Sequence, residues 1–282
     1  MKPALRLVLT FAVAAWVWRL QPGTWWFISA AAGGVAIGLA RYLDYDVAGV
    51  PAVDLALPVL VAVCVYVISV WTHERPAWDQ YFLVIDQSMG LTWGLGRFYT
   101  SHLWLTVMGQ LAYGGAPFWI AVLYLLLPRA ERATFWWAIV GLTLACFVTY
   151  RLFPAAGPRY VFATWPWVEP YVTPHVVMTR AALNCMPSGH FSWSLLTFLF
   201  AWRCCRWPVR LLYATFCALT FVATLGTGEH YWIDLIAALP FTVAVYAAAH
   251  RPWKRWYGAL RRALASTADP IARETGQAGG EP

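Results

Sequence analysis

Residues 230–249 read HYWIDLIAALPFTVAVYAAA, and this stretch decides the class of fold. Its length and apolar character approach the ~20 residues that a helix needs to cross a bilayer. It nevertheless opens with His230 and, four residues later, Asp234. Residues four apart lie on one face of a helix, and an unpaired carboxylate in an apolar setting is costly. We therefore expect these two side chains to pair near the start of this helix.

The composition of the whole chain agrees with a membrane protein. Of the 282 residues, 61% are hydrophobic and only 12% are charged, which lies outside the usual range of soluble domains. The net charge of +7 comes from basic residues in short connections between apolar runs. That distribution indicates membrane topology, so we expect no nucleic-acid partner.

Eight apolar runs predict an all-α fold, a polytopic transmembrane helix bundle, because helices or closed barrels satisfy their backbone within lipid. The first run resembles a signal peptide, but the turn at Gln21-Pro22-Gly23 leads straight into a second run, which favours a retained helical hairpin. The expected spans are 4–20, 24–40, 55–71, 104–127, 134–153, 189–204, 209–226 and 230–249.

Basic residues set the expected orientation. With a cytoplasmic N-terminus, 14 of the 20 basic residues fall on the cytoplasmic side, as the positive-inside rule requires. Both termini are then cytoplasmic, in a multi-pass protein of the cell membrane. The loop 154–188 and the start of the last span are extracytoplasmic. The six basic residues on that face are Arg19, Arg75, Arg97, Arg151, Arg159 and Arg180.

A second polar group opens another span, at Pro187-Ser188-Gly189-His190. Ser188 is a good helix cap, and Gly189 lets the backbone approach a bound group closely. Phosphate binds at helix N-termini, which would leave His190 placed to protonate a leaving oxygen. A lone histidine at a membrane interface is otherwise usually structural.

Residues 153–160, FPAAGPRY, end the fifth span. Two prolines and a glycine stop the helix and fix its exit. Arg159 is then displayed at the mouth of the bundle, where its planar fork suits a phosphate. Arg151 can add charge there or extend to the interface as a lipid-facing residue.

Two further features are less specific. Residues 72–103 form a partly amphipathic stretch that we expect either in the interface plane, as a lid, or as a loop packed on the bundle. Six cysteines offer no disulfide framework, and Cys185, the one near the signature motif, is expected to be a small packing residue.

At these motifs the chain resembles the type-2 phosphatidic acid phosphatase superfamily of membrane lipid phosphatases and phosphotransferases. The resemblance covers roughly residues 130–250. The family's Pro-Ser-Gly-His motif matches in full at 187–190, and His230 and Asp234 match its third motif. The arginine of that third motif should fall at Thr224, where it is missing.

The first motif also departs from the family, because Arg159 follows a proline instead of preceding one. This departure, and Tyr231 directly after His230, look like the branch of inositol phosphorylceramide synthase and the sphingomyelin synthases. The resemblance implies a six-helix phosphatase-like core. We therefore expect an N-terminal hairpin and loop at 1–50, a six-span catalytic core at 51–250, and a basic, partly disordered tail at 251–282.

The resemblance implies phosphoryl transfer through a phosphohistidine. His230 would be the nucleophile, Asp234 its orienting carboxylate, and His190 the acid and then the base. No metal or other cofactor is required. The phosphoryl oxygens are expected to be held by Arg159, Ser188, Gly189 and Arg151.

The expected substrate is a lipid phosphate or phosphodiester, with water or a lipid alcohol as acceptor. Two other functions fit parts of the pattern. A zinc-dependent intramembrane hydrolase would use His190, His230 and either Asp234 or Glu229 as ligands, and chelator would abolish its activity. A lipid-phosphate binder or transporter would need Arg159 and a helix N-terminus without a histidine nucleophile.

The topology makes a direct prediction. In intact cells or spheroplasts, a cysteine introduced in the 160–180 loop should react with an impermeant thiol reagent, and tags on both termini should be inaccessible. Labelling of the loop cysteine only after lysis would invert the topology and move the site to the cytoplasm.

Overall fold

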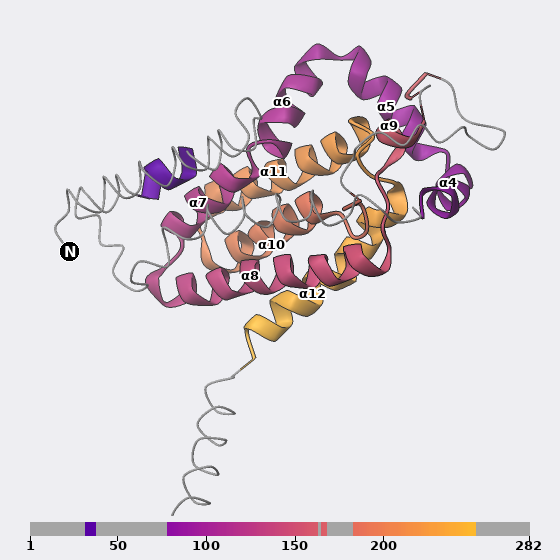
Figure 1. The fold of residues 1–282 in the computed structure, drawn as a ribbon. Coiled ribbons are helices and arrows are strands. Elements are labelled where there is room, and N and C mark those ends of the chain that lie inside the picture. Colours follow the sequence, from indigo (N-terminus) through magenta and orange to yellow (C-terminus); the bar gives the residue numbers. More distant parts are fainter. Residues whose placement is uncertain (1–31, 38–77, 163–164, 168–182, 252–282) are drawn as a thin grey trace, which may run out of the picture. The chain divides into compact units, whose positions relative to one another are not determined.

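The computed structural model describes residues 32–37, 78–162, 165–167 and 183–251 (Figure 1). Within these ranges every regular element is helical, which confirms the all-α class. The expected spans 4–20 and 55–71, most of the span 24–40 and the tail beyond residue 251 lie outside the described residues. The helices are α4 Asp79–Gln87, α5 Leu91–Ser101, α6 Leu103–Tyr113, α7 Ala116–Leu126, α8 Arg129–Leu152, α9 Pro158–Val161, α10 Gly189–Cys204, α11 Trp207–Gly226 and α12 Trp232–Ala249.

Three of these helices, α8, α11 and α12, are long and apolar enough to cross a membrane. The expected single span at 104–127 is in fact two helices, α6 and α7, bent by 59°. The bend falls at Gly114 and Gly115, and a Cβ on Gly115 would lie 2.1 Å from the carbonyl oxygen of Leu111. Counted as one broken span, the pair gives a fourth candidate. Eight spans and a six-helix core remain predictions.

The helix that carries Pro-Ser-Gly-His lies at the centre of the bundle. α10 packs against α7, α8, α11 and α12, and its side chains Leu196 and Phe200 are fully buried in the core. The indole N–H of Trp193 donates to the hydroxyl of Thr143 over 3.1 Å, which joins α10 to α8. α10 spans Gly189–Cys204, the bounds that the sequence predicted.

One buried charged side chain elsewhere in the bundle is satisfied by backbone carbonyls. Arg132, in the first turns of α8, is only 7% exposed. Its guanidinium donates to the carbonyl oxygens of Leu125 and Leu127, both over 3.0 Å, and lies over the ring of Tyr124. The arginine thus caps the C-terminus of α7, which fixes the turn into α8.

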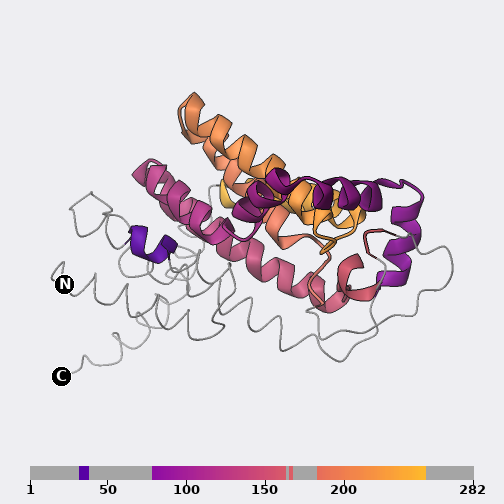
Figure 2. The ribbon, with the colours of Figure 1, turned by 90° about the horizontal axis from the view of Figure 1, so that it is seen from above.

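The site-forming elements gather at one end of the bundle. Figures 1 and 2 both place α4, α5 and α9 where α8 and α11 end and where α10 and α12 begin. Residues 78–101, expected as an interfacial lid or a packed loop, form α4 and α5, joined through Gly90 in the left-handed conformation. α4 exposes Tyr81 and Val84 and buries two carboxylates beside Phe82 and Leu83, which departs from the usual amphipathic pattern.

The packing of α5 on α11 predicts a stability difference between two glycines. A Cβ on Gly226 would lie 2.3 Å from the ring of Tyr99, whereas a Cβ on Gly141 in α8 would meet nothing within 4 Å. Gly226→Ala should therefore destabilise the fold by roughly 1–3 kcal/mol through overpacking. Gly141→Ala should leave stability unchanged or raise it by up to about 1 kcal/mol, through helix propensity. Thermal unfolding of the two purified variants tests this, and equal melting temperatures would contradict it.

Candidate active site

The nucleophile candidate lies in a turn and not on a helix. α12 begins at Trp232, so His230 belongs to the connection from α11, contrary to the expected helical pair. The reason is a cap: the carboxylate of Asp234 accepts the backbone N–H of Tyr231 over 2.7 Å. A carboxylate that reaches back three residues closes the first turn of a helix, so the helix starts after His230.

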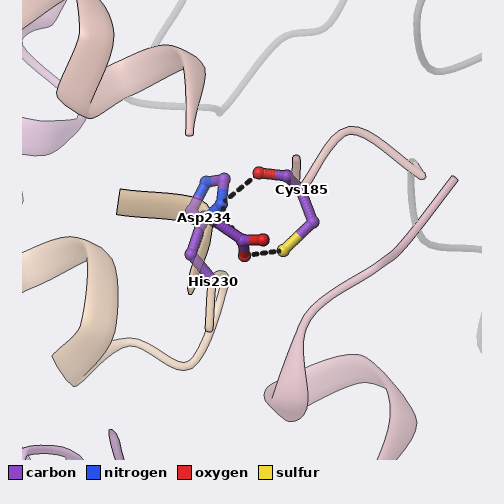
Figure 3. A group of neighbouring side chains, drawn as sticks. All are labelled: Cys185, His230 and Asp234. Carbon is purple, nitrogen blue, oxygen red and sulfur yellow. Dashed lines mark hydrogen bonds and ion pairs between the residues drawn. The ribbon is translucent and has the colours of Figure 1, made fainter. Parts of the chain in front are cut away.

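The orientation of His230 comes mainly from a backbone carbonyl. Its Nδ1 lies 2.8 Å from the carbonyl oxygen of Cys185 and 3.6 Å from Oδ2 of Asp234, as Figure 3 shows. Because a carbonyl oxygen only accepts, Nδ1 carries the proton and Nε2 keeps its lone pair. Asp234 is therefore a second, longer partner of the ring, where the sequence had predicted the direct hydrogen bond.

Cys185 belongs to the same group of side chains as His230 and Asp234, although the sequence predicted only a small packing residue. Its side chain is fully buried, and its thiol lies within hydrogen-bonding distance of Asp234 (Figure 3). Burial, followed by the nearby carboxylates of Asp234 and Asp79, raises the pKa of the thiol well above its usual value. The protonated thiol can then donate to Asp234. Its position two residues before the Pro-Ser-Gly-His motif was the one available signal.

The loop that carries Arg159 packs directly on the turn that carries His230. Gly157 adopts a φ of +95°, and a Cβ there would lie 2.3 Å from the carbonyl oxygen of Glu229. The backbone N–H of Arg159 donates to the carbonyl of Gly228 over 2.8 Å. Only glycine permits both the conformation and the contact. The contact brings Arg159 next to the nucleophile candidate, as the sequence predicted.

Glu229 carries the charge that offsets this arginine. Its carboxylate lies 3.8 Å from the half-exposed guanidinium of Arg159. It also accepts hydrogen bonds from the hydroxyls of Tyr113, over 2.8 Å, and Tyr160, over 3.2 Å. At the position of the missing family arginine, Thr224 is buried and donates its hydroxyl to the carbonyl of Thr220. The mouth of the site is thus less cationic than the family pattern implies.

The Pro-Ser-Gly-His segment has the predicted cap. The hydroxyl of Ser188 accepts the N–H of Phe191 over 3.3 Å, so Ser188 is the N-cap of α10. The N–H of Ser188 donates to the carbonyl of Asp234 over 3.2 Å, which joins the start of α10 to the start of α12. A Cβ on Gly189 would lie 2.5 Å from the hydroxyl of Tyr150, so a larger residue here would require the Tyr150 side chain to move.

His190 lies in the first turn of α10 and stacks on Tyr113. The two ring centroids are 3.8 Å apart and the planes differ by 20°. Because Tyr113 also donates to Glu229, it links His190 to the turn that holds His230. The structure thus places His190 one aromatic ring and one carboxylate away from the turn of His230.

Arg151, the remaining predicted phosphate ligand, lies in the last turn of α8 with an exposed side chain. Among the described residues, the ion pairs of the site join Arg159 to Glu229 and His230 to Asp234, and Arg151 takes part in neither. Its phosphate-binding role remains a prediction.

Among the described residues, one cluster has the donor types of a metal site. Ligand atoms of Cys185, His230 and Asp234 all lie within 4.8 Å of one another, and zinc accepts thiolate, imidazole and carboxylate ligands. The set differs from the predicted zinc ligands, since it contains Cys185 and lacks His190. Here the imidazole and the thiol already have acceptors, the Cys185 carbonyl and the Asp234 carboxylate. The cluster is therefore explained by its own hydrogen bonds.

Comparison with known protein families identifies the class. A family model described as PAP2 superfamily matches residues 80–248, which is more than half of the chain and covers α5 to α11 in full and α4 and α12 except for one terminal residue each. The chain therefore belongs to the PAP2 superfamily, the type-2 phosphatidic acid phosphatases that its motifs resemble. No curated protein and no solved structure matches it. Membership, together with the apolar helices, indicates a membrane protein with a phosphatase-like function in lipid phosphoryl transfer.

Proposed function

We propose that the protein is an integral membrane enzyme that transfers phosphoryl groups of lipid phosphates or lipid phosphodiesters through a phosphohistidine on His230. One observation supports this above the others. The carbonyl of Cys185 accepts from Nδ1 of His230, which fixes the tautomer whose Nε2 is the free nucleophile.

In the proposed reaction, Nε2 of His230 attacks phosphorus in line, and the bond from phosphorus to the leaving oxygen breaks. His190 gives its proton to that oxygen. The acceptor oxygen then attacks phosphorus and the bond from phosphorus to Nε2 breaks, while His190 takes the proton of the acceptor. The phosphorylated ring becomes cationic, and Oδ2 of Asp234, 3.6 Å from Nδ1, stabilises that charge. The transferred oxygens are bound by Arg159 and by the N-terminus of α10 at Ser188 and Gly189.

The proposed class of phosphate donor follows from the charge of the site. A phosphomonoester carries close to two negative charges at neutral pH, whereas a phosphodiester carries one. Glu229 offsets Arg159, and Thr224 stands where the family has a further arginine. A site with less positive charge penalises monoesters relative to diesters. We therefore propose a lipid phosphodiester donor and a lipid alcohol acceptor, as in the inositol phosphorylceramide and sphingomyelin synthase branch.

The reaction is proposed to occur at the extracytoplasmic face of the cell membrane. The support is the distribution of basic residues, which puts the ends of α8 and α11 and the starts of α10 and α12 on that side. These are the four helix ends that carry the site.

The nucleophile provides the first test of this function. His230→Ala should reduce turnover to background, because no other group can form the covalent intermediate. His190→Ala should lose about 100- to 10,000-fold, and less with a better leaving group. His102→Ala is the matched control, since that imidazole lies between α5 and α6 and bonds the carbonyl of Phe98. The assay is steady-state turnover of labelled lipid, with acid-labile label on the protein as a second readout.

Loss of activity only in the two site variants supports the mechanism. Transport or binding of lipid phosphate that persists in His230→Ala, with no turnover by the wild type, would instead establish a non-catalytic binder.

Glu229 provides the test of substrate class. Glu229→Gln removes the negative charge beside Arg159 and keeps an oxygen acceptor for one of the two tyrosine hydroxyls. An exposed ion pair is worth up to about 1 kcal/mol, so kcat/KM for a monoester should rise about threefold to fivefold relative to a diester with the same acyl chains. Glu131→Gln is the matched control. It is the same chemical change in the first turn of α8, at the end of that helix away from the site, and should not alter the ratio of monoester to diester turnover.

The same assay follows the headgroup or phosphate onto an added lipid alcohol. Fast release of inorganic phosphate from monoesters by the wild type, unaffected by any alcohol, would sink the transferase proposal and leave a lipid phosphatase.

A further inference from the structure

Two buried carboxylates in α4 have no role in the mechanism above. Asp79 and Asp86 are each only 1% exposed. They are seven residues apart, two turns of one helix, and share the buried face of α4 with Phe82 and Leu83. Burial of a carboxylate is costly unless donors compensate for the lost water, so the partners of these two groups indicate what they do.

Asp79 connects the two loops of the site. Its carboxylate accepts the backbone N–H of Ala156 over 3.0 Å and that of Gly157 over 2.9 Å, both in the loop that leads to Arg159. It also accepts the hydroxyl of Tyr231 over 2.9 Å, one residue after His230. A single carboxylate thus holds the phosphate-binding loop and the nucleophile turn at a fixed separation.

Asp86 holds the next part of the nucleophile segment. Its carboxylate accepts the backbone N–H of Trp232, the first residue of α12, over 2.8 Å. It also accepts the hydroxyl of Thr92, at the start of α5. An anion at a helix N-terminus interacts favourably with the helix dipole. Asp86 therefore fixes where α12 starts and anchors α4 to α5.

Aromatic packing supports the same arrangement. The ring of Phe82 in α4 meets the ring of Tyr231 edge to face, with centroids 5.9 Å apart. Burial raises the pKa of Asp79, while the N–H groups of Ala156 and Gly157 and the hydroxyl of Tyr231 act in the opposite direction. The desolvation of Asp79 is therefore countered by groups that belong to the site itself.

We propose that α4 is a clamp on the active site, with Asp79 and Asp86 as positioning residues that set the distance between the nucleophile His230 and the phosphate ligand Arg159. The effect on reaction rate rests on the proposed function, whereas the hydrogen bonds of the clamp do not. Misplacement of reacting groups by about 1 Å can cost roughly 100-fold in rate, so the clamp should act on kcat.

Hydrogen exchange of the full-length protein tests the clamp without any substrate. In Asp79→Asn, one acceptor oxygen becomes an amide donor that opposes the loop N–H groups. Backbone exchange at residues 155–157 should become at least about tenfold faster, because local opening becomes easier. In Asp86→Asn the faster exchange should be confined to the start of α12, at Trp232. Gln80→Ala, on the exposed side of α4, should exchange as the wild type does.

Activity and stability are measured on the same variants. Asp79→Asn should lower kcat about 10- to 100-fold with little change in KM or melting temperature. Tyr231→Phe removes only the hydroxyl bond to Asp79 and should show a smaller loss of kcat. This milder variant also decides the case if Asp79→Asn exchanges faster throughout the protein and so fails to fold.

Wild-type exchange at 155–157 in Asp79→Asn, or an unchanged kcat in both Asp79→Asn and Tyr231→Phe, would overturn the clamp. If the wild type itself turns over no lipid phosphate or phosphodiester, the proposed function fails, and the exchange measurements still decide whether α4 holds the two loops.

Discussion

The active site depends on the hydrogen bond from Nδ1 of His230 to the carbonyl of Cys185. This bond fixes the tautomer of the ring, and it can form only where the segment before Pro-Ser-Gly-His lies against the turn between α11 and α12. The N–H of Cys185 in turn donates to the carbonyl of Ala155 over 3.0 Å. Cys185 thus lies between the turn that carries His230 and the loop that carries Arg159, and its backbone bonds both.

The close approach of the loop at Gly157 to the turn at Glu229 limits which residues the site can contain. Gly157 lies so close to the carbonyl of Glu229 that a Cβ would not fit. The packing of these segments also brings three acidic side chains together, those of Asp79, Glu229 and Asp234. Each carboxylate is countered by donors from the neighbouring segments: backbone N–H groups, tyrosine hydroxyls and the Cys185 thiol. These donors make the burial of acids beside a phosphate-binding site energetically possible.

Charge balance then connects structure with chemistry. Arg159, which departs from the first motif of the family by following a proline, forms an ion pair with Glu229. Thr224 uses its hydroxyl inside α11 and contributes no charge. This charge balance is the physical basis for the proposed diester donor, because a site with less positive charge is expected to favour a phosphate with one negative charge.

The sequence by itself determined the all-α class, the bounds of α10 and the Ser188 cap, and it selected His190, His230, Asp234 and Arg159 as candidates for one site. These follow from local rules of apolar length, capping and proline placement, and from motifs within a few residues. Only the tertiary structure decided the carbonyl partner of His230, the place of Cys185, the bend between α6 and α7 and the role of Asp79. The decisive hydrogen bonds join residues 45, 77 and 152 positions apart, and no local pattern encodes such pairs, because they form only when the helix ends meet.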